Sequence, residues 1–372
     1  MRIGFDAKRL FNNKTGLGNY SRTFVWNLAK HYPENEYFLY SPKLTKSELT
    51  EKFIDNPAFV LRSSDAFLKS YWRSYGIVEQ LQKDGLDVFH GLSHEIPIGI
   101  KKTKIKSVVT IHDMIFKILP ETFPLIDRKV YDFKFRYSCN NADKIIAISE
   151  STKKDIQKYY QIADSKIEVV YQSCHPIYYE PQDTVLAKIT LKKHKLPKQY
   201  ILSVGSIEAR KNLDTLINAI SLIDPEIRLP LVVVGKGKKY KEKCIKLTKE
   251  LGLKKEVFWI DNLDSVAELR CIYNKATAFV YPSFYEGFGL PVVEALLSET
   301  PVITSKSSSL TEAGGPHSIY IDPKNPEEIK NAIESILLNK FDIAKMVSVG
   351  KEYALEKFNC IQTPYLYECL NV

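Results

Sequence analysis

The sequence predicts two doubly wound α/β domains, each Rossmann-like, that face each other across a cleft. Three observations lead to this fold class. The chain has 372 residues, which is enough for two domains with a core each. Short runs rich in β-branched residues alternate with helix-length segments in both halves, and this alternation favours parallel sheets covered by helices on both faces. Polar residues come directly after several predicted strands, where doubly wound sheets bind ligands.

The predicted strands of the first half are short apolar runs that end in polar residues: 3–6, 87–90, 106–112 and 144–149. Before the last of them, four apolar residues recur at helical spacing: Ile126, Val130, Phe133 and Tyr137. We expect this stripe to be a buried helix face, although basic residues alternate with it.

The second half shows the same alternation of short strands and helices. Its predicted strands are 200–205, 231–235, 257–260, 278–281 and 301–304, and its predicted helices include 212–222, 239–251 and 264–274. The break between the halves is expected in the polar stretch 182–198, which gives an N-terminal domain over 1–190 and a C-terminal domain over 191–353.

The composition is that of an ordinary globular protein, with 44% hydrophobic and 26% charged residues. No apolar run is as long as a bilayer span and the first residues lack the apolar centre of a signal peptide, so we expect a cytoplasmic protein. The six cysteines are scattered, and no grouping has metal-ligand spacing, so free thiols and no metal are expected.

The formal net charge of +9 indicates acidic partners or, alternatively, a solvated lysine-rich surface. Phosphorylated ligands and a peripheral contact with a membrane surface both fit this charge. No nucleic-acid-binding signature accompanies it, so nucleic acid is not an expected partner.

The most informative segment is 281–296, in which Glu286 and Glu294 flank a loop with two glycines. Pro291 stands where a helix would begin, since the first helical position does not use its N–H. The N–H groups at such a helix start form an anion site, and Glu294 would fall in its first turn. Donors for a phosphate beside two carboxylate acceptors suit a nucleotide-sugar.

Arg210 and Lys211 are adjacent cations at the end of the first strand of the second half, ahead of a helix that Asn212 would cap. At the carboxyl end of a strand they would neutralise a diphosphate without a metal, whereas exposed to solvent they would have no such role. We favour the first interpretation.

Glycine and histidine mark three strand ends in the first half. Gly16 and Gly18 precede a predicted helix and form either a tight turn or a ligand loop, without the Gly-x-Gly-x-x-Gly fingerprint of dinucleotide sites. His112 with Asp113, and His90 with the following glycine, are either satisfied core histidines or groups that contact a sugar or handle a proton.

Taken together, the segments 282–294, 301–305, 310–312, 204–213 and 111–114 resemble the family-four retaining glycosyltransferases of the GT-B fold, in particular a subgroup rich in bacterial mannosyltransferases. The resemblance covers nearly the whole chain. It implies transfer of a hexosyl group, with mannosyl favoured, from a GDP- or UDP-linked sugar to the hydroxyl of a saccharide or lipid-linked saccharide in polysaccharide biosynthesis. The sugar's anomeric configuration would be retained, and no metal or other cofactor would be needed.

The resemblance also implies which residues bind the donor: Gly16, Gly18, Arg210, Lys211, Ile260, Asp261, Asn262, Leu263, Phe288, Gly289, Leu290 and Glu294. In this assignment the two cations hold the diphosphate and Glu294 holds the ribose hydroxyls. Residues 260–263 would lie at the base, and 288–290 would offer backbone N–H groups. The two glycines of the first domain would line the phosphates.

The catalytic assignments implied by the resemblance are Glu286 and His112 at the transferred sugar, with Asp113 supporting that region. The first domain would be the acceptor side and the second the nucleotide-sugar side. The segment 354–372 resembles the final family helix, which returns to pack on the first domain.

Several alternatives remain open from the sequence. Asp261 and Asn262 replace a commonly found glycine, so the base is undecided between GDP and UDP, and a UDP-dependent glucosyl or galactosyl transferase is an alternative. A GT-B sugar-nucleotide epimerase, a nicotinamide-dependent dehydrogenase and a silent sugar-nucleotide-binding protein are the others. Alanine at Lys211 or Glu294 is expected to weaken donor binding with little change in melting temperature, unless these residues belong to a buried ionic network.

Overall fold

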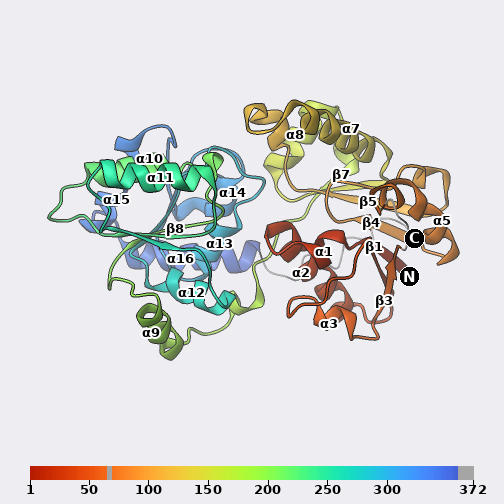
Figure 1. The fold of residues 1–372 in the computed structure, drawn as a ribbon, viewed down its shortest axis with the longest axis horizontal. Coiled ribbons are helices and arrows are strands. Elements are labelled where there is room, and N and C mark those ends of the chain that lie inside the picture. Colours follow the sequence, from red (N-terminus) through yellow and green to blue (C-terminus); the bar gives the residue numbers. More distant parts are fainter. Residues whose placement is uncertain (65–68, 359–372) are drawn as a thin grey trace. The chain divides into compact units, whose positions relative to one another are not determined.

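The computed structural model describes residues 1–64 and 69–358 (Figure 1). The chain folds into two compact units, the first built from residues 1–172 and the second beginning at Ser173. Each unit contains one parallel sheet with helices on both faces, so the two predicted doubly wound domains are confirmed. The described residues include no helix long and apolar enough to cross a bilayer.

The first unit has a seven-stranded sheet in the order β3-β2-β1-β4-β5-β6-β7. Its strands are β1 (Arg2–Asp6), β2 (Glu36–Ser41), β3 (Phe59–Ser63), β4 (Val88–Gly91), β5 (Lys106–Ile111), β6 (Lys144–Ala147) and β7 (Ile167–Val169). All neighbours pair in parallel. Chain order reverses between β1 and β4, and doubly wound sheets bind ligands at the carboxyl ends of such a switch point.

Helices cover this sheet on both faces, and each face has its own apolar core. The helical segments are α1 (Lys8–Asn12), α2 (Gly16–His31), α3 (Glu51–Ile54), α4 (Lys69–Tyr71), the π-helix η1 (Trp72–Gly76), α5 (Ile77–Lys83), η2 (Ile100–Lys102), α6 (Ile115–Ile118), η3 (Pro120–Thr122), α7 (Leu125–Asn141), α8 (Glu150–Tyr160) and η4 (Asp164–Lys166).

The second unit has a six-stranded parallel sheet in the order β10-β9-β8-β11-β12-β13. Its strands are β8 (Ile201–Val204), β9 (Leu231–Val234), β10 (Val257–Ile260), β11 (Ala278–Tyr281), β12 (Val302–Ser305) and β13 (Ile319–Ile321). The switch point lies between β8 and β11, whose carboxyl ends carry the Arg210 and Glu286 segments.

The helical segments of the second unit are η5 (Pro176–Tyr179), α9 (Thr184–Lys193), η6 (Ala209–Lys211), α10 (Leu213–Leu222), α11 (Lys239–Glu250), α12 (Val266–Lys275), α13 (Leu290–Leu297), α14 (Leu310–Gly314), η7 (Gly315–His317), α15 (Pro326–Leu337) and α16 (Ile343–Lys357). Side-chain caps define several helix starts: Asp183, Ser265, Asn325 and Asp342 each accept a backbone N–H of the first turn. On α10, Leu216, Ile217 and Ile220 pack into the sheet core.

The division between the units falls at 172/173, earlier than the expected boundary at 190/191. The reason is that residues 176–193 pack on α12. The Arg270 guanidinium donates to the carbonyls of Glu180 and Pro181, and Lys193 pairs with Glu268 at 2.5 Å. Of the expected final helix over 354–372, only the start belongs to α16, and 359–372 lie outside the described residues.

The expected buried face of α7 is wrong. Ile126, Val130 and Phe133 are exposed, whereas Phe135 and Cys139 are buried. Phe135 stacks on His94 with ring centroids 4.3 Å apart and anchors the helix to the sheet. Two apolar stripes run along this helix, and spacing alone does not tell which of them meets the core.

Candidate functional site

Two cations and a carboxylate meet at the carboxyl ends of β8 and β11. The Glu286 carboxylate lies 2.7 Å from the Arg210 guanidinium and 2.6 Å from the Lys211 ammonium, and accepts from the Tyr281 hydroxyl at 3.0 Å. Lys211 also contacts the Tyr281 hydroxyl and lies over its ring. The structure therefore brings together three of the predicted site residues, which we call the Glu286 cluster.

Electrostatics fix the charge state of the Glu286 cluster. Burial alone would raise the pKa of Glu286, but Lys211 and Arg210 lower it to about 2. Burial lowers the pKa of Lys211, and the Glu286 carboxylate opposes that change. A carboxylate held by two cations is ionised across the physiological range and is a hydrogen-bond acceptor only.

The loop that carries Glu286 is held from behind by a serine triplet. The hydroxyl of Ser307 donates to Phe284 O at 3.1 Å, and Ser309 donates to the carbonyls of Glu286 and Phe288 at 2.9 and 2.8 Å. The Glu286 N–H donates to Ser308 Oγ at 3.1 Å. These bonds fix the backbone conformation that aims the carboxylate at the cations.

The Asn212 side chain joins the loop of Arg210 and Lys211 to the Glu286 loop. It does not cap α10, although the sequence predicted that it would. Asn212 stands at the N-cap position in the left-handed region, with φ of 59°. Its amide donates to Pro282 O at 3.1 Å and Pro323 O at 2.6 Å. Arg210 adds a bond to Tyr285 O at 2.8 Å, so the two loops form one rigid edge.

Helix α13 begins at Leu290 and its N-cap is Gly289, in the left-handed region with φ of 112°. The left-handed backbone favours glycine here, and a Cβ would also press on the end of the Leu310 side chain at 2.8 Å. Pro291 is in the first turn, as predicted, whereas Glu294 lies one position beyond it. The Phe288 ring is buried against Phe358, so the predicted donor contact of Phe288 would have to use its backbone.

Glu294 has a different set of partners from Glu286. Its carboxylate accepts from the Tyr273 hydroxyl at 3.1 Å, and Tyr178 lies behind Tyr273 with ring centroids 6.3 Å apart. Burial raises the pKa of Glu294 to about 7, which the two tyrosine hydroxyls only moderate. No cation lies among the described contacts of Glu294. It is therefore a half-buried carboxyl group with a pKa near neutral, and a hydrogen-bond acceptor when ionised.

The segment predicted to lie at the nucleotide base follows β10. Ile260 is buried and its carbonyl accepts the Gly235 N–H at 2.9 Å, while Asp261 and Asn262 are exposed and Leu263 is half-buried. Asp261 pairs with Lys241. A Cβ on Gly235 would lie 1.8 Å from the Gly205 carbonyl, so the ends of β8 and β9 touch through their backbones.

In the first unit, the two glycines of the predicted ligand loop differ sharply. A Cβ on Gly18 would lie 1.9 Å from Asn13 O, which also accepts from the Arg22 guanidinium at 2.8 Å. A Cβ on Gly16, at the start of α2, would meet nothing within 4 Å. Gly18 is thus required by the packing of this turn, whereas Gly16 has open space around it. Contact of either glycine with a ligand stays a prediction.

We therefore predict opposite outcomes for two alanine substitutions. Gly18→Ala should lower the free energy of unfolding by about 1–3 kcal/mol or more because the turn must move. Gly16→Ala should leave it unchanged or raise it by about 0.4–1 kcal/mol. Urea unfolding measures both free energies. The thermal shift with a sugar nucleotide then tests whether Gly16 belongs to a ligand loop or only to a tight turn. Weaker binding in Gly16→Ala supports the ligand loop, and unchanged binding leaves only the tight turn.

His112 is buried with both ring nitrogens engaged. Nε2 lies 2.9 Å from Leu92 O and so donates, which leaves Nδ1 to accept from the Gln172 amide at 3.1 Å. Burial and the neighbouring His94 lower its pKa to about 3. This is the geometry of a satisfied core histidine, and a role at the transferred sugar stays a prediction. Asp113 is half-buried and accepts the Ile115 N–H at 3.1 Å.

His90, the other histidine at a strand end, is also buried, with Nε2 2.8 Å from Thr110 Oγ1. Thr110 Oγ1 also lies 3.1 Å from the Tyr20 hydroxyl, and the His90 ring meets Phe24 edge to face. Burial lowers the pKa of His90 to about 3, so it is neutral. It supports the sheet edge and does not carry a charge there.

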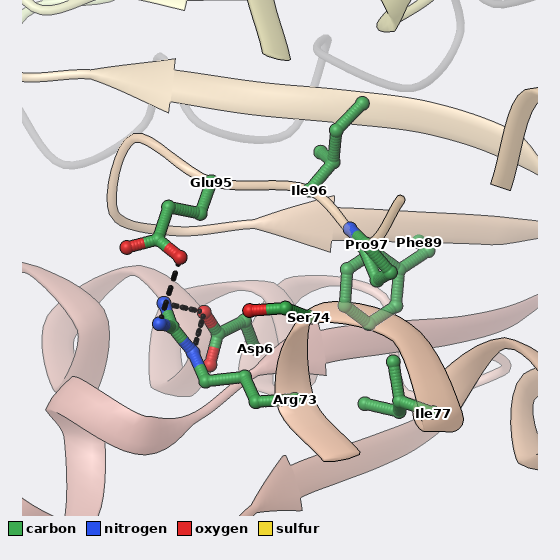
Figure 2. A pocket seen from close by; sticks show the side chains of 8 residues that line it. All are labelled: Asp6, Arg73, Ser74, Ile77, Phe89, Glu95, Ile96 and Pro97. Carbon is green, nitrogen blue, oxygen red and sulfur yellow. Dashed lines mark hydrogen bonds and ion pairs between the residues drawn. The ribbon is translucent and has the colours of Figure 1, made fainter. Parts of the chain in front are cut away.

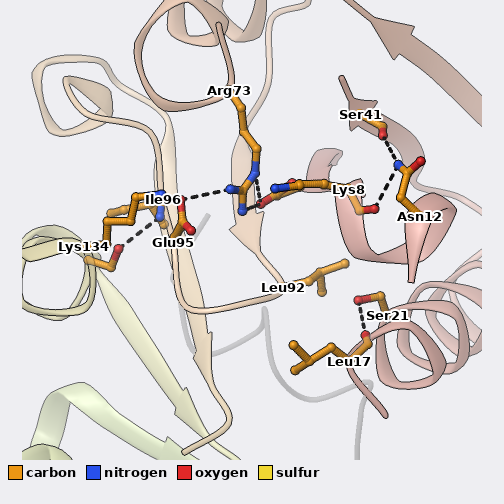
Figure 3. Close-up of polar contacts among 12 residues, drawn as sticks. Lys8, Asn12, Leu17, Ser21, Ser41, Arg73, Leu92, Glu95, Ile96 and Lys134 are labelled. Carbon is orange, nitrogen blue, oxygen red and sulfur yellow. Dashed lines mark hydrogen bonds and ion pairs between the residues drawn. The ribbon is translucent and has the colours of Figure 1, made fainter. Parts of the chain in front are cut away.

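The sequence did not reveal a chain of charged residues in the first unit, three of which, Asp6, Arg73 and Glu95, line a small pocket (Figure 2). Arg73 donates to Asp6 at 2.5 Å and to Glu95 at 3.0 Å, and Lys134 donates to the same Glu95 oxygen at 3.0 Å (Figure 3). We call these four residues the Asp6–Lys134 chain. Asp6 ends β1 and Arg73 lies in a π-helix, which is a rare element often found at functional sites.

No metal-binding group of three or more His, Cys, Asp or Glu side chains occurs within residues 1–64 and 69–358. The four cysteines that can be described there are buried thiols: Cys139, Cys174, Cys244 and Cys271.

Comparison with known families gives two matches that together span most of the chain. The family described as "Glycosyl transferases group 1" matches residues 188–354. The family described as "Glycosyltransferase Family 4" matches residues 21–174. The first match contains the Glu286 cluster and Glu294, and the second contains His112 and most of the Asp6–Lys134 chain.

Curated relatives share modest identity with the chain. An O-antigen chain mannosyltransferase B of Escherichia coli is 26% identical over 393 residues, covering all of both chains. The O-antigen chain mannosyltransferase RfbU of Salmonella typhimurium is 29% identical over 243 residues, which is 65% of this chain and 63% of the relative. A serotype-specific mannosyltransferase WbdA of Escherichia coli is 29% identical over 267 residues, only 31% of its length.

Solved structures share the fold of the whole chain. Anabaena HepE, crystallised with UDP, superposes with a TM-score of 0.77 at 15% identity over all of both chains. WaaG, a glycosyltransferase involved in lipopolysaccharide biosynthesis, gives 0.72 at 17% identity over 100% of this chain and 99% of its own. At these identities the likeness concerns architecture.

Proposed function

The chain belongs to the group 1 and family 4 glycosyltransferases of the GT-B fold, and from this premise we propose that it moves a mannosyl group from GDP-mannose to a saccharide or lipid-linked saccharide hydroxyl with retention of configuration. The Glu286 cluster carries the proposal. Arg210 and Lys211 are two fixed cations at the carboxyl edge of the sheet, beside the α13 start. Such an edge is where doubly wound domains hold nucleotides.

The two cations would stabilise the charge that develops on the departing diphosphate. Arg210 offers a planar fork and Lys211 a compact charge, and both are held in place before the donor arrives. Preplaced cations do not have to reorganise during the reaction, so they lower the barrier without a resident metal. The diphosphate would share these cations with the Glu286 carboxylate.

Glu286 would orient the transferred sugar rather than attack it. Its carboxylate is engaged by two cations and a tyrosine hydroxyl, which leaves it a weak nucleophile and a good acceptor for sugar hydroxyls. With no other nucleophile at the cluster, the leaving phosphate would accept the acceptor's proton on the same face of the sugar. Glu294 would accept both ribose hydroxyls.

The sugar and the acceptor are proposed from the relatives. The names of these curated relatives favour mannose and a bacterial surface polysaccharide. A UDP-linked donor is the second candidate, since HepE binds UDP on the same fold. Acceptor contacts would come from the first unit, where the Asp6–Lys134 chain offers both carboxylates and cations to a saccharide.

A thermal-shift panel tests the donor. GDP-mannose should raise the melting temperature more than GDP-glucose, UDP-glucose or UDP-galactose, because a ligand that binds only the folded state stabilises it more the tighter it binds. A larger shift with a UDP-sugar would favour the second candidate, a UDP-linked donor. No shift with any sugar nucleotide would contradict the proposed function.

Mass spectrometry then tests the reaction. With donor and candidate saccharides, a transferase yields a product one hexose heavier, at the same rate in EDTA. With donor alone, an epimerase would form a new sugar nucleotide, whereas the proposed enzyme gives only slow hydrolysis. Rapid epimerisation without acceptor would overturn the proposal.

A further inference from the structure

Two cations follow β1 without an acidic partner. Lys8 and Arg9 begin α1, directly after the strand that ends at Asp6, and both are half-buried. Within residues 1–64 and 69–358, neither side chain forms an ion pair or a hydrogen bond. A half-buried charge gives up part of its hydration, and proteins ordinarily offset that loss with a partner. These two cations are therefore available to an anion from outside the chain.

The carboxylates nearby are engaged by other cations of the Asp6–Lys134 chain. Asp6 accepts the Arg73 guanidinium through Oδ2 at 2.9 Å and the backbone N–H of Lys8 through Oδ1 at 3.2 Å. Glu95 accepts from both Arg73 and Lys134 through Oε2 (Figure 3). The chain therefore satisfies its own charges and leaves the side chains of α1 without a counterion.

The field at the α1 cations is positive. Burial, Arg73 and Arg9 lower the pKa of Lys8, and nearby carboxylates only oppose this change. Burial and then the charge of Arg9 lower the pKa of His94 to about 3, so the guanidinium also acts on that ring. An anion among these groups would relieve the repulsion between the cations.

His94 adds a neutral donor to the cations. It follows β4 in the left-handed region with φ of 64°, a strained conformation of the kind that is retained at functional sites. The ring stacks on Phe135, and Nδ1 accepts the His112 N–H at 3.4 Å. The proton of the neutral ring is therefore on Nε2, which has no partner among the residues that the structure describes. A fixed N–H donor is left for a ligand.

Parallel strand pairing brings these groups to one edge of the first sheet. Strands β1 and β4 are neighbours, with Phe5 opposite His90. Lys8 and Arg9 follow the first of these strands and His94 follows the second, so all three leave the sheet at its carboxyl end. This is the switch point of the sheet, where doubly wound domains bind ligands.

We propose that Lys8, Arg9 and His94 bind a phosphate group carried by the acceptor saccharide. The inference rests on the proposed function, in which the first unit holds the acceptor. Arginine supplies a planar fork, lysine a compact charge and histidine a neutral N–H, and three separate donor groups suit a phosphate because it has more acceptor oxygens than a carboxylate. The donor diphosphate has its own cations, Arg210 and Lys211, in the second unit.

Calorimetric titration in saturating GDP tests the proposal, because GDP occupies the donor site. Mannose 1-phosphate should bind about tenfold or more tightly than mannose, and also more tightly than inorganic phosphate. Lys8→Gln with Arg9→Gln should weaken the binding of mannose 1-phosphate about tenfold or more and leave the binding of GDP-mannose unchanged. The melting temperature should stay the same or rise, since the cations removed have no partner, whereas a purely structural role would lower it.

Lys101→Gln with Lys102→Gln is the matched control. These adjacent lysines are exposed in η2, ahead of β5 and therefore at the amino end of the same sheet, and their replacement removes the same charge. It should not change the binding of mannose 1-phosphate. Circular dichroism verifies that each variant is folded.

Four outcomes overturn the proposal. They are no binding of mannose 1-phosphate, equal binding of mannose and mannose 1-phosphate, an equal loss in both double variants, and weaker binding of GDP-mannose in Lys8→Gln with Arg9→Gln. The last would assign the two cations to the donor. The thermal shift of the wild type with GDP-mannose judges the proposed function separately, because none of these outcomes alters it.

Discussion

Replacing Lys211 by methionine should lower the transfer rate by about 100- to 1000-fold, because a preplaced charge at the departing diphosphate is lost. The side chain keeps most of its length, so the change is mainly one of charge. Lys211→Arg restores the charge but not the compact shape, and should recover part of the rate. Steady-state kinetics with GDP-mannose and a saccharide acceptor measures the effect.

The same substitution should also lower the melting temperature, because Lys211 belongs to the buried ionic network that the sequence left open as an alternative. Lys211 neutralises the buried Glu286 carboxylate, and breaking a buried ion pair costs about 3–5 kcal/mol when no partner remains. Arg210 remains 2.7 Å from that carboxylate, so the loss should be smaller than this range. Rates must therefore be measured well below the melting temperature.

Lys243→Met is the control for Lys211→Met. Lys243 pairs with Asp214 at 2.9 Å but its side chain is largely exposed, and such surface pairs contribute about 0–1 kcal/mol. Both rate and melting temperature should stay near the wild-type values. A Lys211→Met enzyme that retains its wild-type rate would remove the Glu286 cluster from the mechanism.

Glu294→Gln should make the protein more stable and its donor binding weaker. Burial raises the pKa of Glu294 to about 7, against an ordinary value of 4.5, so the folded state favours the protonated form. Its contribution to stability is therefore fully present below pH 4.5 and is lost as the pH rises through 7. A neutral glutamine avoids this loss and should stabilise the protein by about 3 kcal/mol at about pH 8, with little effect at about pH 4.

Donor binding should follow the opposite trend. An ionised carboxylate accepts both ribose hydroxyls, and a neutral amide in its place should weaken donor binding by about 10- to 100-fold above neutral pH. Wild-type affinity should rise as the pH increases through about 7, and the variant should lose that dependence. Calorimetric titration with GDP-mannose at several pH values measures both effects.

Glu250→Gln supplies the control for Glu294→Gln. Glu250 is exposed on α11 and lies 3.5 Å from Lys246, so its substitution should change neither the pH profile of stability nor donor affinity. If Glu294→Gln is destabilised across the whole pH range, the carboxylate is ionised and paired in a way the structure does not contain.

Local sequence patterns predicted the central strands well because these strands are buried on both faces and are therefore nearly continuous apolar runs. Strands β2, β3, β7 and β13 were not predicted. The buried run of β2 is mainly aromatic rather than β-branched, β3 is only half-buried along most of its length, and β7 and β13 have three residues each. The exposed face of α7 was missed for a related reason, since two apolar stripes compete and only tertiary packing decides between them.

At the candidate site, the sequence assigned Arg210, Lys211 and Glu286 to the same donor, and the structure brings them together because β8 and β11 are neighbouring parallel strands. The sequence did not predict that they neutralise each other or that Tyr273 reaches Glu294, since these contacts join elements far apart in the chain. Arg73 was missed entirely. No residue near it signals a π-helix or the distant carboxylates of Asp6 and Glu95.

The packing of residues 176–193 on α12 determines where this protein can be cut or recombined. A fragment that starts at Ser173 keeps Tyr178 beside Tyr273 and supplies the carbonyls of Glu180 and Pro181 to Arg270. A fragment that starts at residue 191 would lack these groups. The buried Arg270 guanidinium would then lose two acceptors, and the side of Tyr273 behind Glu294 would be exposed. Hybrids that exchange donor halves between homologous enzymes should therefore be joined just ahead of Ser173, where one compact unit gives way to the next.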